Sequence, residues 1–151
     1  MTFQTSRAWF IGDDGRRRLD YSISVLMHGH PVGYGSIYIT PKETAQVGVA
    51  RVTVTGCGVG TRLYEKMYKT ACSNGARLVS DDGRTDFSEG FWKKQQRKGR
   101  AYCVNKNVRG RRLHYDGNMI QETGQTWSCG RWGMKRKCSR PVNLTGGRRR
   151  G

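Results

Sequence analysis

The segment TGCGVGT at residues 55–61 constrains the fold of this chain more than any other feature. Residues 46–55 before it follow the period of two that predicts a strand, and residues 60–74 after it place apolar side chains at helical spacing. A strand that enters a helix through a glycine-rich turn presents unpaired backbone N–H groups at the positive end of the helix dipole. The segment therefore predicts a pyrophosphate cradle. A tight turn is the alternative, although three alternating glycines exceed what a turn needs.

The flanking sequence predicts a mixed α+β domain. Residues 18–28 and 34–40 alternate in the same way, and the intervening GHPVG predicts an antiparallel hairpin. After the first helix, the pattern predicts a strand over 77–80, a turn over 81–84, a helix over 88–97 with Ser88 or Asp86 as N-cap, and strands over 101–105 and, more weakly, 112–121. Periodicity is weak beyond residue 122, and we expect residues 146–151 to be disordered.

Three kinds of phosphate-binding fold could contain such a loop. A P-loop is excluded because no Gly-Lys-Ser/Thr follows the glycines. A dinucleotide-binding fold would explain Asp81, which lies where a ribose-binding acid is expected. However, Thr61 stands where that motif has Gly or Ala, and three predicted strands precede the loop.

The third candidate is the GCN5-related N-acetyltransferase (GNAT) superfamily, which the order of elements resembles over residues 18–105. Residues 55–60 match the family's Gln/Arg-x-x-Gly-x-Gly/Ala motif in all but its first position, and residues 85–92 (TDFSEGFW) occupy the frame of its Asn-x-x-Ala-x-x-Phe-Tyr signature. The resemblance implies a mostly antiparallel central sheet with flanking helices, and acetyl-CoA or another acyl-CoA as cofactor. The cofactor-binding residues that it implies are Val54, Thr55, Gly56, Cys57, Gly58, Val59, Gly60, Thr61, Thr85 and Trp92.

The sequence also departs from the family pattern. The frequent strand glutamate is absent, with Arg51 and Thr53 in its neighbourhood, and Trp92 replaces a tyrosine that could protonate a departing thiolate. Only about ten residues separate Phe10 from Tyr21, which leaves no room for the two family helices that frame the acceptor. We therefore expect a GNAT-like fold that is reduced at the N-terminus, with the basic C-terminal segment near the acceptor.

Acyl transfer from a thioester to an amine requires a base, donors to the oxyanion and an acid for the thiolate. Asp81 is the candidate base, although a turn carboxylate in Asp81-Asp82-Gly83 is an equally good interpretation. Tyr102 is the candidate acid or a core residue, and Ser88 could bond the cofactor or cap its helix. Cys57 lies within the phosphate-binding turn, so we do not expect it to be a nucleophile.

The charge of the chain is concentrated in its second part. Lys and Arg total 28 against 11 Asp and Glu, and residues 93–151 contain 17 of the former but only Asp116 and Glu122 of the latter. Aromatic residues interleave with these cations, which favours nucleic acid over a solvated tail. The candidate phosphate contacts are Lys93, Lys94, Arg97, Arg109, Arg111, Arg112, Arg131, Lys135, Arg136 and Lys137.

Five cysteines in an unpatterned set, the absence of a secretory pattern in residues 1–10 and the lack of a long apolar run predict a reduced cytoplasmic location without membrane insertion. In a phage-encoded protein this would be the host cytoplasm. Cys129 and Cys138, with Cys103 and His114 as possible partners, lack the paired spacing of zinc sites, so no metal site is predicted.

These observations predict a GNAT-like acyl-CoA-binding domain over residues 1–121 and a basic extension over 122–151. The favoured function is N-acyl transfer to a polyanion-associated acceptor, above all a nucleic-acid base. The loop and the helix over residues 88–92 loosely resemble those of phage Mom-type DNA-modification proteins, and this resemblance implies DNA rather than RNA as the partner. A tRNA base or a protein amine as acceptor, and a non-catalytic module that binds nucleic acid or a host protein, are the alternatives. The acyl group, the acceptor atom and the oligomeric state are left open.

Overall fold

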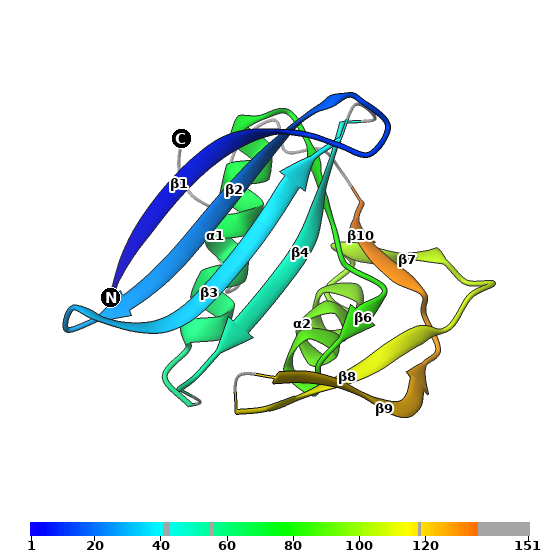
Figure 1. Ribbon diagram of the computed structural model, residues 1–151. Helices are drawn as coiled ribbons and strands as arrows, with labels where there is room; N and C mark the ends of the chain where they lie inside the picture. Colours follow the sequence, from blue (N-terminus) through cyan, green and yellow to red (C-terminus); the bar gives the residue numbers. More distant parts are fainter. Residues whose placement is uncertain (41–42, 55, 118, 136–151) are drawn as a thin grey trace. The chain divides into compact units, whose positions relative to one another are not determined.

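The computed structural model describes residues 1–40, 43–54, 56–117 and 119–135, which divide into two compact units (Figure 1). The first unit is Met1–Leu78, and the second begins at Val79 and includes the chain to residue 135. The predicted domain boundary at residue 121 falls inside a strand of the second unit. The described part of the predicted extension therefore continues a folded unit.

Four consecutive antiparallel strands form the sheet of the first unit. They are β1 (Thr2–Ile11), β2 (Arg17–Met27), β3 (His30–Ile39) and β4 (Thr44–Val52). Helix α1 (Val59–Ser73) packs on β2, β3 and β4 (Figure 1). A Cβ on Gly35 would lie 3.0 Å from side-chain atoms of Leu63 and Met67, so glycine permits the close approach of this helix. Fully buried Ile23, Ile37, Leu63 and Met67 belong to the core of this unit.

The two tight connections between the first three strands differ in form. The β2–β3 turn consists of His28 and Gly29, both at positive φ, which is the backbone of a type I′ hairpin. The predicted connection over 29–33 was therefore too long, since Pro31 lies within β3 beside a register shift that accommodates it. Residues 12–16 link β1 directly to β2, so the predicted lack of helices at this point is confirmed.

The second unit combines one helix with short strands. These elements are β6 (Gly83–Arg84), α2 (Asp86–Arg97), β7 (Ala101–Asn105), β8 (Gly110–Asp116), β9 (Met119–Trp127) and β10 (Arg131–Met134). Strand β10 pairs antiparallel with β7 and, through Gly133 and Val79, with the end of β5 (Arg77–Val79). Strand β8 pairs parallel with β6 and antiparallel with β9. The predicted single strand over 112–121 is thus two strands, which are separated by a turn that contains Gly117 at φ 60°.

A buried arginine forms hydrogen bonds to several segments of the second unit. Arg84 is 2% exposed and donates from Nε to Glu89 Oε1 at 2.8 Å. Its Nη1 donates to the carbonyls of Asp81 and Gly130 at 2.7 and 2.9 Å, and its Nη2 donates to the carbonyl of Cys129. Such a buried charge is tolerated because its donors are satisfied. This network joins β6, α2 and the segment before β10. The sequence pattern had predicted only a turn at Arg84.

Both units follow the predicted class, a mixed α+β architecture with mostly antiparallel strands and flanking helices. Among the described residues, no helix has the length and apolar character needed to cross a membrane.

Candidate functional site

The predicted phosphate-binding loop connects β4 to α1 in the first unit (Figure 1). Strand β4 ends at Val52, three residues before the predicted end, and α1 begins at Val59. Gly58 is the N-cap residue at φ 73°, and Gly56 has φ 81°; both lie in the left-handed region that favours glycine. Apart from the glycine itself and the residues next to it in the chain, no described heavy atom comes within 4 Å of the position that a Cβ would take on either glycine. The loop is therefore open to a ligand, and a larger residue would fill that space.

The start of α1 is suited to a negative charge. Gly58 has no side chain with which to cap the helix, so the first N–H groups depend on other acceptors. The first turn contains no acidic residue, and Arg62, which the sequence analysis did not select, is exposed there. An anion at this position would gain from the helix dipole, and Arg62 adds a positive charge to the same turn.

The remaining loop residues contribute in different ways. Val59 is 1% exposed, and its side chain lies 3.0 Å from the Cβ position of Gly33, so it belongs to the core. Only its backbone could meet a cofactor. Val54 and Thr61 are half-buried, Gly60 is buried, and Cys57 is an exposed free thiol. Thr55 lies outside the described residues.

Asp81, the candidate base, follows β5 in the second unit. Burial raises the pKa of the Asp81 carboxyl above its ordinary value, and the hydrogen bond with the Asp82 side chain adds to this effect. Burial also acts to raise the pKa of Asp82, but the hydrogen bond from Arg111 holds that pKa below its ordinary value. Adjacent carboxyls with pKa values displaced in opposite directions are typical of acid and base roles. Asp81 is the member that binds a proton more readily.

Tyr102, the candidate acid, lies on β7 at 36% exposure. Its Cε1 atom and the Cγ2 atom of Val79 are each 3.8 Å from the Cβ position of Gly133. Both side chains therefore lie on the same face of β10, which runs between β5 and β7. The structure thus places Asp81 at the end of one neighbour of β10 and Tyr102 on the other.

Two predictions for α2 require correction, namely its N-cap residue and the cofactor-binding role of Trp92. Thr85, and neither Ser88 nor Asp86, is the N-cap, because Thr85 Oγ1 accepts a hydrogen bond from the Ser88 N–H at 3.3 Å. Ser88 lies within the first turn of α2 and is buried. Trp92 is fully buried and packs edge-to-face on Phe91 with 5.6 Å between the ring centroids. It is a core residue of the second unit, so it offers no surface to a cofactor.

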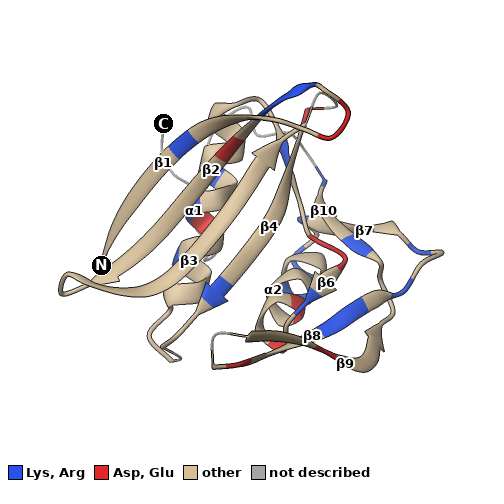
Figure 2. Cartoon of the chain, in the orientation of Figure 1, with Lys and Arg blue, Asp and Glu red and all other residues tan. Residues whose placement is uncertain are grey.

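The structure separates the predicted nucleic-acid contacts into two groups. Arg111 forms ion pairs with Asp82 and Glu122, and the Arg112 guanidinium makes a bidentate pair with Asp86 at 2.8 and 2.9 Å. The other described members of the set are exposed or half-buried cations, namely Lys93, Lys94, Arg97, Arg109, Arg131 and Lys135. Figure 2 shows the basic residues along β8 and in the loop that links it to β7. Arg136 and Lys137 lie outside the described residues.

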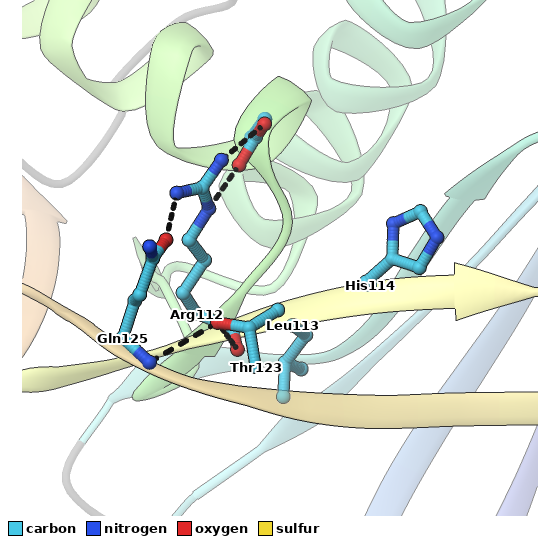
Figure 3. Close-up of a pocket in the computed structure, with 6 residues that line it drawn as sticks. Arg112, Leu113, His114, Thr123 and Gln125 are labelled. Carbon is cyan, nitrogen blue, oxygen red and sulfur yellow. Dashed lines mark hydrogen bonds and ion pairs between the residues drawn. The ribbon is translucent and has the colours of Figure 1, made fainter.

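Arg112 also lines a cavity of about 330 Å³ in the second unit. Its guanidinium donates to Gln125 as well as to Asp86, and Figure 3 shows it directed toward Gln125 while His114 points away. The Arg112 ion pair holds the pKa of Asp86 below its ordinary value. The charged groups of this cavity therefore satisfy one another, so we assign no ligand to it.

The unpatterned cysteines, from which a reducing compartment was predicted, include a disulfide-bonded pair. Cys103 on β7 and Cys129 form a disulfide with an S–S distance of 2.05 Å. A disulfide removes both thiolates as metal ligands, and the described residues contain no group of three or more side chains suited to a metal ion. Disulfides are uncommon in reducing compartments. The cytoplasmic location remains a prediction.

Comparison with solved structures identifies the fold as that of acetyltransferases, in agreement with the GNAT-like architecture expected from the sequence. The IAA acetyltransferase from Bacillus cereus ATCC 14579 aligns with 88% of this chain and 99% of its own, with a TM-score of 0.51 and 14% identity. Aminoglycoside 6′-acetyltransferase type Ii aligns over 81% of this chain and 72% of its own, with a TM-score of 0.49 and 16% identity. No protein-family model matches the sequence, and neither does any curated protein. Identities this low show the fold alone.

Proposed function

We propose that this protein is a GNAT-type N-acyltransferase that uses acetyl-CoA or another acyl-CoA. The observation that carries the proposal is the open glycine loop at the start of α1, which has two left-handed glycines and a helix without a capping side chain. Backbone N–H groups at such a helix start bind phosphate oxygens. When bound, an acyl-CoA supplies an activated acyl group as a thioester.

For proton transfer we propose the roles expected from the sequence for Asp81 and Tyr102. Asp81 would accept the proton of the acceptor amine, because its raised pKa brings its basicity closer to that of a base working near neutral pH. Tyr102 would donate a proton to the leaving sulfur, a role for which the buried Trp92 has no suitable group. Cys57 would have no chemical role in direct transfer.

Calorimetric titration with coenzyme A and acetyl-CoA tests the cofactor. We expect wild-type protein to bind both and Gly58→Val to lose binding, because a side chain at φ 73° both strains the loop and fills the space for phosphate. Gly29→Val is the matched control, because Gly29 also has positive φ and open space but lies in the β2–β3 turn. Absence of binding by the wild type, or equal loss in both variants, would contradict the proposal.

The acceptor that we propose is an amine on a polyanion, with a DNA base as the favoured case. Residues 90–115 contain nine Lys and Arg and no Asp or Glu, which supports a polyanionic partner. Mass spectrometry of DNA, RNA and total protein from cells that make the wild type or Gly58→Val would identify the acceptor. If a protein lysine is acylated and the nucleic acid is unmodified, the acceptor is the protein amine and not a base.

A binding module without catalysis is the second candidate. The missing strand glutamate and the buried Trp92 in place of a tyrosine favour it. Binding of coenzyme A with no thioester turnover in the presence of DNA, RNA and basic protein would select this alternative.

A further inference from the structure

A second cavity in the second unit, of about 340 Å³, has a lining whose charged side chains are all positive. Lys93 and Arg97 of α2 and Lys106 of the β7–β8 loop line it, together with Ser128 and the disulfide partners Cys103 and Cys129. Three cations and a hydroxyl around one cavity suit the oxygens of a phosphate group. Lys106 and Ser128 are not among the site residues predicted from the sequence.

The backbone around this cavity is firmly held. Lys93 and Arg97 are four residues apart on α2, so their side chains share one face of the helix. The Cys103–Cys129 disulfide and a 2.8 Å hydrogen bond from the Gly130 N–H to the Asn105 carbonyl join the two chain segments of the wall. The cations are thus presented from a preorganised framework, which lowers the entropy lost when a ligand binds.

The three cavity cations differ from Arg111 and Arg112 in their electrostatic surroundings. Both arginines are ion-paired with carboxylates, whereas Lys93, Arg97 and Lys106 form no ion pair among the described residues. The Nζ atom of Lys93 instead lies over the ring of Trp127, 5.9 Å from its centroid. The charge of the cavity is therefore available to an external anion.

Further cations extend beyond the cavity. Lys94 lies on α2 next to Lys93, and Lys98 is the C-cap residue of that helix. Arg100 comes directly before β7. The pKa of Lys98 is lowered, first by desolvation and then by repulsion from Lys94 and Arg100. An extended polyanion that also lies over these cations would relieve this repulsion.

We infer that this cavity binds a backbone phosphate of a nucleic-acid strand, and that the strand continues over Lys94, Lys98 and Arg100. The inference rests on the polyanionic acceptor of the proposed function and specifies where it binds. Because the contact is to phosphate, it fixes the position of the strand without reading its sequence.

Fluorescence anisotropy with a labelled 20-base-pair DNA, at several salt concentrations and under oxidising conditions, tests the inference. We expect the Arg97→Gln/Lys106→Gln variant to bind at least tenfold more weakly and to reduce the slope of log K against log salt by about 0.9, the value for one lost phosphate contact. The matched control is Arg7→Gln/Arg16→Gln, which removes two exposed cations of the first unit. It should change affinity by less than about threefold, as expected for charges that make no direct phosphate contact. Circular dichroism melts would confirm that both variants fold.

Three outcomes would overturn the inference. They are equal losses in the two variants, competition by poly-glutamate as strong as that by unlabelled DNA, and micromolar binding of inorganic phosphate that only the cavity variant loses. The last would assign the cavity to a small phosphorylated ligand. DNA binding that depends on the cavity without any binding of coenzyme A would instead disprove the proposed function and leave this site intact.

Discussion

The two units of the molecule are stabilised in different ways. In the first unit, each strand pairs with the next along the chain, and an apolar helix face covers the sheet. In the second, a buried arginine, a disulfide and short strands join segments that lie far apart in sequence. Local pairing distributes stability over many small contacts, whereas the second unit concentrates it in a few polar and covalent ones.

The same contrast extends to the candidate functions. The loop at residues 56–60 would bind its ligand through backbone N–H groups, so its requirement is for glycine and for open space. The second unit would act through side chains, whose protonation and charge depend on their neighbours. Single substitutions should therefore have specific effects on chemistry and stability in the second unit, and the following predictions test this.

The largest effect is expected for Arg84→Met. Removal of the guanidinium leaves the buried Glu89 carboxylate without its ion-pair partner, which typically costs about 3–5 kcal/mol of unfolding free energy. Chemical denaturation would measure this loss. Arg112→Met is the control, since its pair with Asp86 is largely exposed and should contribute less than about 1 kcal/mol. Similar losses of unfolding free energy in the two variants would show that the buried ion pair contributes no more to stability than the exposed one.

Loss of the disulfide should follow closely. Cys103 and Cys129 are separated by 26 positions, and the chain-entropy relation gives about 3.5 kcal/mol for closing a loop of this length. The Cys103→Ser/Cys129→Ser variant should lose this amount of unfolding free energy, and reducing agent should then have no further effect through this pair. Cys57→Ser, which removes the exposed free thiol, should match the wild type.

Asp81→Asn should lower acyl transfer about a hundredfold, the usual size of a general-base contribution. Because the active form is the carboxylate and its pKa is raised, wild-type activity should increase with pH through a range above that of an ordinary aspartate. The variant should lack this limb of the pH profile. Tyr102→Phe should lose activity to a similar degree, and Cys57→Ala should retain it. Full activity of both Asp81→Asn and Tyr102→Phe would show that other groups transfer the protons.

The smallest expected effect concerns the helix caps. Thr85→Ala removes the hydroxyl that accepts from the Ser88 N–H, which should cost about 1 kcal/mol of stability in thermal or chemical melts. Since Thr85 Oγ1 is used in capping, affinity for coenzyme A should stay within about twofold of the wild type. A large loss of affinity would instead support the predicted role of Thr85 in cofactor binding.

Pattern alone was sufficient where one face of an element is buried. Strands β2–β4 and helices α1 and α2 were predicted within a few residues because their apolar side chains alternate or recur against a core. Strand β1 and strand β9 have mostly exposed side chains, so neither carried a burial pattern to detect. Their pairing with β2 and β8 comes from backbone hydrogen bonds, which depend little on side-chain type.

By itself, the sequence determined the order of most elements, the glycine loop before the first helix and the excess of positive charge, because these depend on neighbouring residues. Only the tertiary structure decided that Arg84 is buried against Glu89, that Cys103 pairs with Cys129 and that Trp92 belongs to the core. It also decided which cations are neutralised by carboxylates and which line a cavity. Each of these depends on distances between residues remote in the chain, and composition and periodicity contain no such distances.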